Sequence, residues 1–107
     1  MEKYSLKDMT KGWFIGPFTP TLHSTDQFEV AVKRYSRGDF ENKHLHKIST
    51  EYTVILNGEV KMNGIIYKDG DIIKILPNDS TDFECLSDSV TTVVVKTPAS
   101  LGDKYEC

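Results

Sequence analysis

The sequence predicts an all-β domain, built as a small antiparallel sandwich or barrel. Its apolar runs are short and rich in β-branched and aromatic residues, which favour strands. Turn-forming pairs such as Asn63-Gly64 and Asp69-Gly70 separate these runs. No segment longer than a few residues has the period of an amphipathic helix. In a chain of 107 residues, short strands joined by turns indicate one antiparallel domain with a single core.

The apolar runs also give the position of each strand. We expect strands at residues 12–18, 28–36, 42–46, 51–57, 59–62, 65–68, 71–76, 81–86 and 90–97. Asn57-Gly58, Asn63-Gly64 and Asp69-Gly70 suit tight hairpins, because Asn, Asp and Gly tolerate positive φ. We expect one domain over residues 1–107, with a core at about 12–98 and short peripheral arms at both ends.

The expected strand at residues 51–57 is apolar on both faces. Glu51, Thr53 and Ile55 alternate with Tyr52, Val54 and Leu56, and successive strand residues point to opposite sides. A strand of this kind is covered on both sides. One side is then the interior of the domain, and the other meets a second layer, an arm or another subunit. We therefore expect a homodimer.

Composition excludes several classes of partner. The net charge is −3, and the basic residues are scattered among acidic ones, which is unlike a nucleic-acid-binding surface. No apolar stretch is long enough to span a membrane, and the first residues lack the apolar core of a signal peptide, so we expect a cytoplasmic protein. Cys85 and Cys107 are too few for a disulfide framework. Cys85 is predicted to be a small core residue.

The candidate functional residues lie between residues 38 and 58. His44 and His46 alternate along a predicted strand, so their side chains share one face. Glu51 opens the next strand after a short polar connection. Two imidazoles and one carboxylate that converge form a site for a divalent metal or for proton transfer.

This window resembles the first sequence motif of the cupin superfamily. That motif is a Gly, five residues, His-x-His, three or four residues, a Glu, six residues and a Gly, and it is matched at every spacing by Gly38, His44, His46, Glu51 and Gly58. The resemblance covers nearly the whole chain, from about Trp13 to Pro98. It implies a small antiparallel β-barrel, also described as a jelly roll or double-stranded β-helix.

The second cupin motif is incomplete in this sequence. When it is aligned from Gly70, the position of its metal-binding histidine falls at Thr81, and a threonine hydroxyl is a poor ligand for a transition metal. A slip by one residue places Pro77 on the motif's proline and Asp82 on its histidine. We prefer the first register, because the slip also needs a longer spacer. Asp82 is then the only substitute for the missing ligand.

The resemblance implies three functional hypotheses. In the first, His44, His46 and Glu51 hold a divalent Fe, Mn, Ni or Zn ion that acts on, or binds, a small polar metabolite. In the second, His44 and His46 are the catalytic acid and base of a metal-free nucleotide-sugar isomerase or epimerase. In the third, the domain binds a small ligand without catalysis. Fold analogy does not choose among them.

Three further aromatic residues complete the predictions. Tyr35 is a candidate acid or substrate contact. Tyr52 is expected to face away from Glu51, and Trp13 is assigned to the core.

Overall fold

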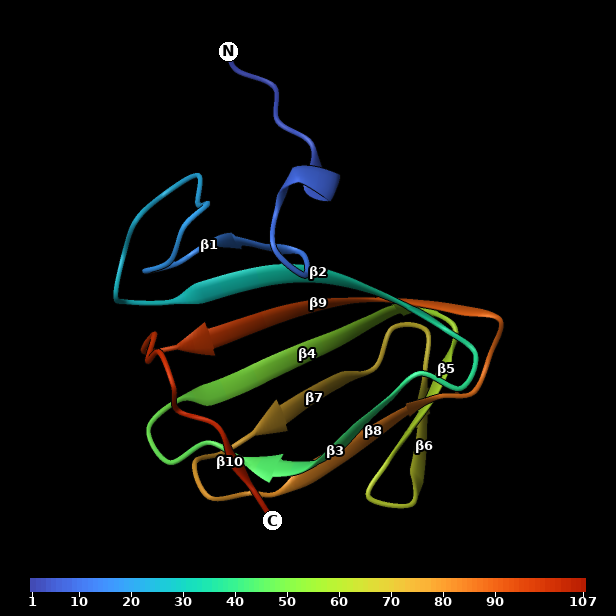
Figure 1. Ribbon diagram of the computed structural model, residues 1–107. Coiled ribbons are helices and arrows are strands. Elements are labelled where there is room, and N and C mark those ends of the chain that lie inside the picture. Colours follow the sequence, from blue (N-terminus) through green and yellow to red (C-terminus); the bar gives the residue numbers. More distant parts are fainter.

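The computed structural model describes all 107 residues and confirms the predicted all-β fold (Figure 1). A short 3-10 helix, η1 (Leu6–Asp8), precedes the strands. The strands are β1 (Trp13–Ile15), β2 (Glu29–Ser36), β3 (Phe40–Leu45), β4 (Thr50–Asn57), β5 (Glu59–Met62), β6 (Ile65–Lys68), β7 (Ile72–Ile75), β8 (Thr81–Cys85), β9 (Ser89–Thr97) and β10 (Tyr105–Glu106). No helix of this structure is long and apolar enough to cross a membrane.

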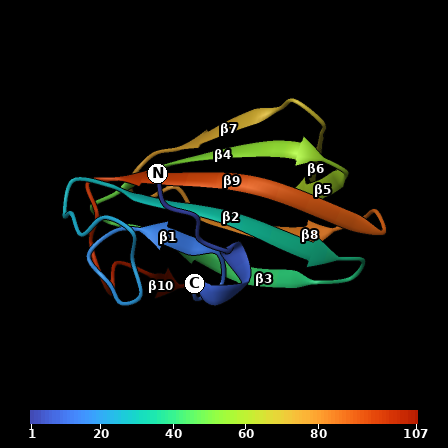
Figure 2. The same ribbon diagram turned by 90° about the horizontal axis from the view of Figure 1, so that it is seen from above.

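The strands form two five-stranded antiparallel sheets. The first sheet has the order β1-β2-β9-β4-β7, and the second has the order β10-β3-β8-β5-β6. The two sheets face each other as the layers of a flattened barrel, and Figure 2 shows the first sheet's strands side by side in that order. Each predicted strand is present, and β5 and β6 have the predicted bounds.

Only one of the three Gly-containing pairs forms the predicted hairpin turn. Asn63 and Gly64 both have positive φ, 51° and 79°, and they join the paired strands β5 and β6. Asn57-Gly58 and Asp69-Gly70 instead carry the chain between the two sheets. The prediction of hairpins at these two pairs was therefore wrong. A glycine indicates a turn with positive φ, but it does not show whether the two strands that the turn joins pair with each other.

The C-terminal arm is not peripheral, in contrast to the prediction. β10 pairs with the end of β3, and the nearby residue Asp103 is buried, with an exposed fraction of 5%. This arm closes the end of the barrel where β3 ends and β4 begins (Figure 1).

The apolar core occupies one end of the barrel and leaves the other end polar. The buried core residues are Ile55, Val60, Met62, Ile75, Phe83, Cys85 and Val90, which include the predicted Cys85. Toward the other end, the cross-strand neighbours on β2, β9 and β4 are Glu29, Lys96 and Glu51. A row of three charged side chains inside a sheet is costly to bury without partners or a ligand. The polar end of the barrel is therefore the expected position of a ligand-binding site.

Candidate functional site

A cavity of about 840 Å³ opens between the two sheets at the polar end of the barrel. The sequence-predicted residues His44, His46 and Glu51 all line it, together with Thr81. Its size lies in the range of small-molecule pockets. The structure thus brings the three main candidates to one cavity.

A β-bulge in β3 sets which side chains enter the cavity. Glu41 lies opposite Phe83 and His44 lies opposite Thr81, so three steps along β3 match two steps along β8. Without the extra residue, an odd spacing would put Glu41 and His44 on opposite faces. With it, both side chains line the cavity. Glu41 is thus a site residue that simple alternation does not predict.

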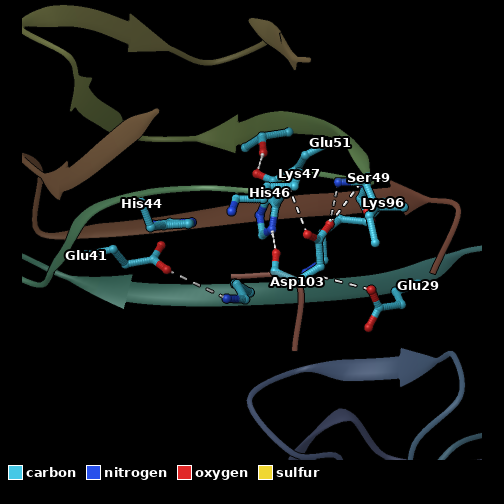
Figure 3. A network of polar contacts seen from close by, with 12 residues as sticks. Glu29, Glu41, His44, His46, Lys47, Ser49, Glu51, Lys96 and Asp103 are labelled. Carbon is cyan, nitrogen blue, oxygen red and sulfur yellow. Dashed lines mark hydrogen bonds and ion pairs between the residues drawn. The ribbon is translucent and has the colours of Figure 1, made fainter. Parts of the chain in front are cut away.

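His46 is fixed at both ring nitrogens (Figure 3). Its Nδ1 contacts the backbone carbonyl of Asp103, and a carbonyl only accepts, so Nδ1 carries a proton. Its Nε2 lies 3.4 Å from Oε1 of Glu51. The residue itself is buried, with an exposed fraction of 5%. The ring is therefore held in one orientation at the cavity wall.

Glu51 and His46 shift each other's pKa in opposite directions. The hydrogen bond to Glu51 is the main cause that raises the pKa of His46, although burial opposes it. Burial pushes the pKa of Glu51 upward, but the bonds from His46 and Thr53 outweigh it and leave that pKa lowered. The hydroxyl of Thr53 donates to Oε2 of Glu51 at 2.8 Å. The pair is therefore an imidazolium beside a carboxylate over a wider pH range than two isolated groups.

His44 stands next to this pair with a free ring nitrogen. Its Nδ1 lies 3.0 Å from the carbonyl of Asn42 and donates to it, which leaves Nε2 as the acceptor of the neutral ring. The centroids of the His44 and His46 rings are 5.4 Å apart, edge to face. The Nε2 atom of His44 and the His46–Glu51 pair thus face the same small volume.

Asp103 is the most important site residue that the sequence reasoning missed. Its carboxylate accepts the backbone N–H groups of Lys47, Ile48 and Ser49 at 2.9–3.0 Å, and its carbonyl accepts His46 (Figure 3). These bonds hold its pKa low although burial acts to raise it. One C-terminal residue thus orders the whole connection between His46 and β4. No local pattern reveals this, because the partners are more than fifty positions apart in the sequence.

The aromatic and basic residues around the histidines agree with the sequence predictions only in part. Tyr35 lines the cavity, as a candidate contact should, but its hydroxyl donates to Glu41 at 3.0 Å, and burial is the main cause that raises its pKa. Trp13 lines the cavity and is not part of the buried core. Tyr52 does not line the cavity, in agreement with the prediction. Lys33 and Lys96, which the strand patterns did not single out, also line it.

His44, His46 and Glu51 have the atom types that bind a divalent metal, but their positions suit such an ion only in part. The separation of His46 Nε2 and Glu51 Oε1, 3.4 Å, is about that of two ligands on one ion with ~2.1 Å bonds. Both imidazoles also have Nδ1 bound to a carbonyl, as metal-binding histidines usually do. However, no three His, Cys, Asp or Glu side chains are grouped so as to hold a metal.

Asp82 is not at the candidate metal position. Its Oδ1 accepts the backbone N–H of Asn63 at 2.6 Å, and the side chain does not line the cavity. Thr81 occupies the place opposite His44 instead. The strand alternation explains the correction: Thr81 and Phe83 point inward, so Asp82 points outward.

Comparisons with known proteins bear on the fold. No family model matches the sequence, and no curated protein matches it either. Among solved structures, a Klebsiella pneumoniae protein with a double-stranded beta-helix domain is 24% identical, with a TM-score of 0.66 over 73% of this chain and 69% of that one.

Two functionally described structures share the fold. A sugar phosphate isomerase of the cupin superfamily from Silicibacter pomeroyi is 23% identical, with a TM-score of 0.61 over 66% of this chain and 50% of that one. Bacillus subtilis oxalate decarboxylase, described with Mn(II) centres, is 14% identical, with a TM-score of 0.63 over 77% of this chain and 24% of that one. The chain therefore has the fold of the cupin superfamily, the double-stranded β-helix.

Proposed function

We propose that this chain is a small-molecule enzyme in which His46 and His44 act as acid and base on a substrate held in the cavity. The observation that carries the proposal is the state of His46. Glu51 favours its protonated form, Asp103 fixes its orientation, and Nε2 of His44, which is not engaged by Asn42, lies close to it. Proton transfer of this kind requires an acid and a base whose environments differ, and only His46 has a carboxylate partner here.

The reaction class is proton transfer next to a carbonyl group, as in an isomerase or epimerase. Nε2 of His44 removes the proton from the carbon beside the carbonyl. The proton that Nε2 of His46 shares with Glu51 passes to the carbonyl oxygen. Where the deprotonated carbon carries a hydroxyl group, an enediol results. In an isomerase, His44 returns the proton to the former carbonyl carbon, and the hydroxyl of the neighbouring carbon gives its proton back to His46 and becomes the new carbonyl. In an epimerase, the original carbon is protonated on its other face, and the enol O–H returns its proton to His46. Glu51 stabilises the imidazolium before transfer and is a positioning residue. The cupin-fold sugar phosphate isomerase gives a precedent for this class.

Solvent deuterium exchange tests this proposal without knowledge of the product. The protein is incubated in D₂O with ketose and uronate sugars, free and phosphorylated, and mass spectrometry follows deuterium at the carbon next to the carbonyl. We expect exchange with at least one sugar, and a loss of about 100-fold or more in His44→Gln and His46→Gln. His23→Gln is the matched control, because the third histidine is exposed and lies outside the cavity. Equal exchange in all four proteins would refute the proposal.

A divalent metal held by His44, His46 and Glu51 is the second candidate. The carbonyl-bound Nδ1 atoms and the 3.4 Å separation of His46 and Glu51 favour it. A bound ion would supply a Lewis acid beside the substrate. His44, His46 and Glu51 would then be the residues that hold the ion. Precedent comes from oxalate decarboxylase, which shares the fold and is described with Mn(II) centres.

Elemental analysis separates the two candidates. The metal candidate predicts close to one Fe, Mn, Ni or Zn per chain, lost in His46→Ala and retained in His23→Ala. The metal-free candidate predicts less than a tenth of an equivalent in all three proteins, even after metal is offered in excess. Ligand binding without exchange and without metal would instead indicate a non-catalytic binding domain.

A further inference from the structure

The cavity concentrates positive charge in a protein that is negative overall. Six of the thirteen Lys and Arg residues line it, against three of the sixteen Asp and Glu residues. The basic ones are Lys7, Lys11, Lys33, Arg34, Lys96 and Lys104. In the rest of the molecule acidic residues outnumber basic ones, which gives the whole chain its net charge of −3. An excess of one sign of charge in a cavity attracts ligands of the other sign.

Lys33 and Lys96 are the two basic residues deepest in this cavity. They enter from the neighbouring strands β2 and β9, and their side chains are only 21% and 15% exposed. Their Nζ atoms lie 5.3 and 5.0 Å from the centroid of the same Trp13 ring. Burial lowers the pKa of Lys33, which is the sign of an ammonium group that lacks full solvation.

The carboxylates near these lysines leave ammonium protons available. Lys33 Nζ is 4.0 Å from Glu41, and Lys96 Nζ is 3.7 Å from Glu29. Both distances exceed those of charge-assisted hydrogen bonds. Consistent with this, the buried Oε2 of Glu29 has no hydrogen-bond partner. In each pair the opposite charges are near each other, but the hydrogen bonds that stabilise two buried charges are missing.

Thr92 supplies a further unused donor at the same place. It lies directly opposite Lys33 in the register of β2 and β9, and it lines the cavity. It is 1% exposed, and its hydroxyl has no hydrogen-bond partner. Buried hydroxyl groups are usually satisfied, so an exception in a cavity wall points to a missing ligand.

We propose that Lys33, Lys96 and Thr92 form a carboxylate-binding subsite, so that the natural ligand of the cavity is a small organic acid. The lysines supply charge and N–H donors, the threonine supplies a hydroxyl donor, and the Trp13 ring forms an apolar wall for the carbon chain. The subsite adjoins the histidines, because Lys96 and Glu51 are cross-strand neighbours and both line the cavity together with His46. This inference rests on the proposed function for the cavity, and it narrows the substrates to acids such as sugar acids.

Binding of matched sugars tests the subsite. ¹⁵N-labelled protein is titrated separately with D-glucuronate, D-glucose and D-glucose 6-phosphate, and amide shifts are followed on β2 and β9. We expect saturable shifts with glucuronate, none with glucose, and at least tenfold weaker glucuronate binding in Lys33→Met and Lys96→Met. Lys61→Met is the control, because this lysine is on the surface and outside the cavity. Its affinity should equal that of the wild type.

Several outcomes would overturn the subsite. They are equal binding of glucose and glucuronate, unchanged binding in both lysine variants, preference for the phosphate sugar, or no shift with any sugar. The spectra also report whether each variant is folded. His46→Gln separates this inference from the proposed function. If the subsite exists but the proposed proton transfer does not occur, His46→Gln still binds glucuronate, and neither this variant nor the wild type catalyses deuterium exchange.

Discussion

His46 shows how distant residues determine the chemistry of one side chain. It lies one residue beyond the end of β3, and its protonation depends on Glu51 and on the carbonyl of Asp103. The sequence spacing of His44, His46 and Glu51 was sufficient to predict that they meet. The role of Asp103 was beyond sequence reasoning, because a single aspartate in a terminal segment has no local signature.

Asp103 should be essential for the order of the segment that carries His46. Asp103→Asn replaces one carboxylate oxygen by an amide and leaves at least one of these backbone N–H groups without an acceptor. We expect a loss of about 2 kcal/mol in the free energy of unfolding, measured with urea. Asp88→Asn is the control, since Asp88 pairs with Arg37 on the surface and its side chain is 94% exposed. Equal effects of the two substitutions would show that the bonds of Asp103 are unimportant.

The ion pair of His46 and Glu51 should make stability depend on pH. The raised pKa of His46 contributes stability below its ordinary value of 6.5, and this is lost as pH rises through the folded-state pKa. The lowered pKa of Glu51 contributes stability above its ordinary value of 4.5, and this is lost as pH falls through the folded-state pKa. We therefore expect the Tm difference between wild type and Glu51→Gln to be largest at about pH 5–6 and to shrink by pH 9. A difference that is constant from pH 5 to 9 would contradict the coupling.

At the level of elements, alternation succeeded where strands are regular and failed where they are not. β4 places Glu51 and Thr53 inward and Tyr52 outward, as predicted. In β3, the bulge adds Glu41 to the cavity wall. In β2, the charged Glu29 and Lys33 face the interior, although the valines between them are the more apolar residues. A local pattern cannot show that the interior at this end is a polar cavity.

Two glycines with similar backbone angles should respond differently to substitution. Gly58 and Gly64 have φ values of 87° and 79°, so alanine is strained by about 1 kcal/mol at either position. A Cβ at Gly58 would lie 2.4 Å from the carbonyl oxygen of Ser89, whereas one at Gly64 meets nothing within 4 Å. We expect Gly58→Ala to cost about 3 kcal/mol and Gly64→Ala about 1 kcal/mol in urea unfolding. Equal losses of stability in the two variants would show that the backbone of Ser89 does not crowd position 58.

At the level of the molecule, the outer face of the first sheet has no covering layer. Ile72, Val54, Val93 and Val32 form a cross-strand row over four strands, and Ile72 is 67% exposed. This row includes the outward side of β4, for which the sequence predicted a cover. We propose that a second copy of this chain covers it, because a flat apolar face can pair with itself about a two-fold axis.

Light scattering after size-exclusion chromatography tests this assembly. We expect the wild type to have twice the mass of one chain and Ile72→Lys to be a monomer. Ile66→Lys should remain a dimer, because Ile66 is 56% exposed but lies in the second sheet. A monomeric wild type at about 100 μM would argue against the homodimer.

The most direct test of the whole account is an NMR titration of the three histidines in the wild type and in Glu51→Gln. The account predicts that His46 titrates above 6.5 in the wild type and that its pKa falls in Glu51→Gln. A His46 that titrates at or below 6.5, or does not titrate because a bound metal occupies Nε2, would contradict the acid–base pair on which the proposed function rests.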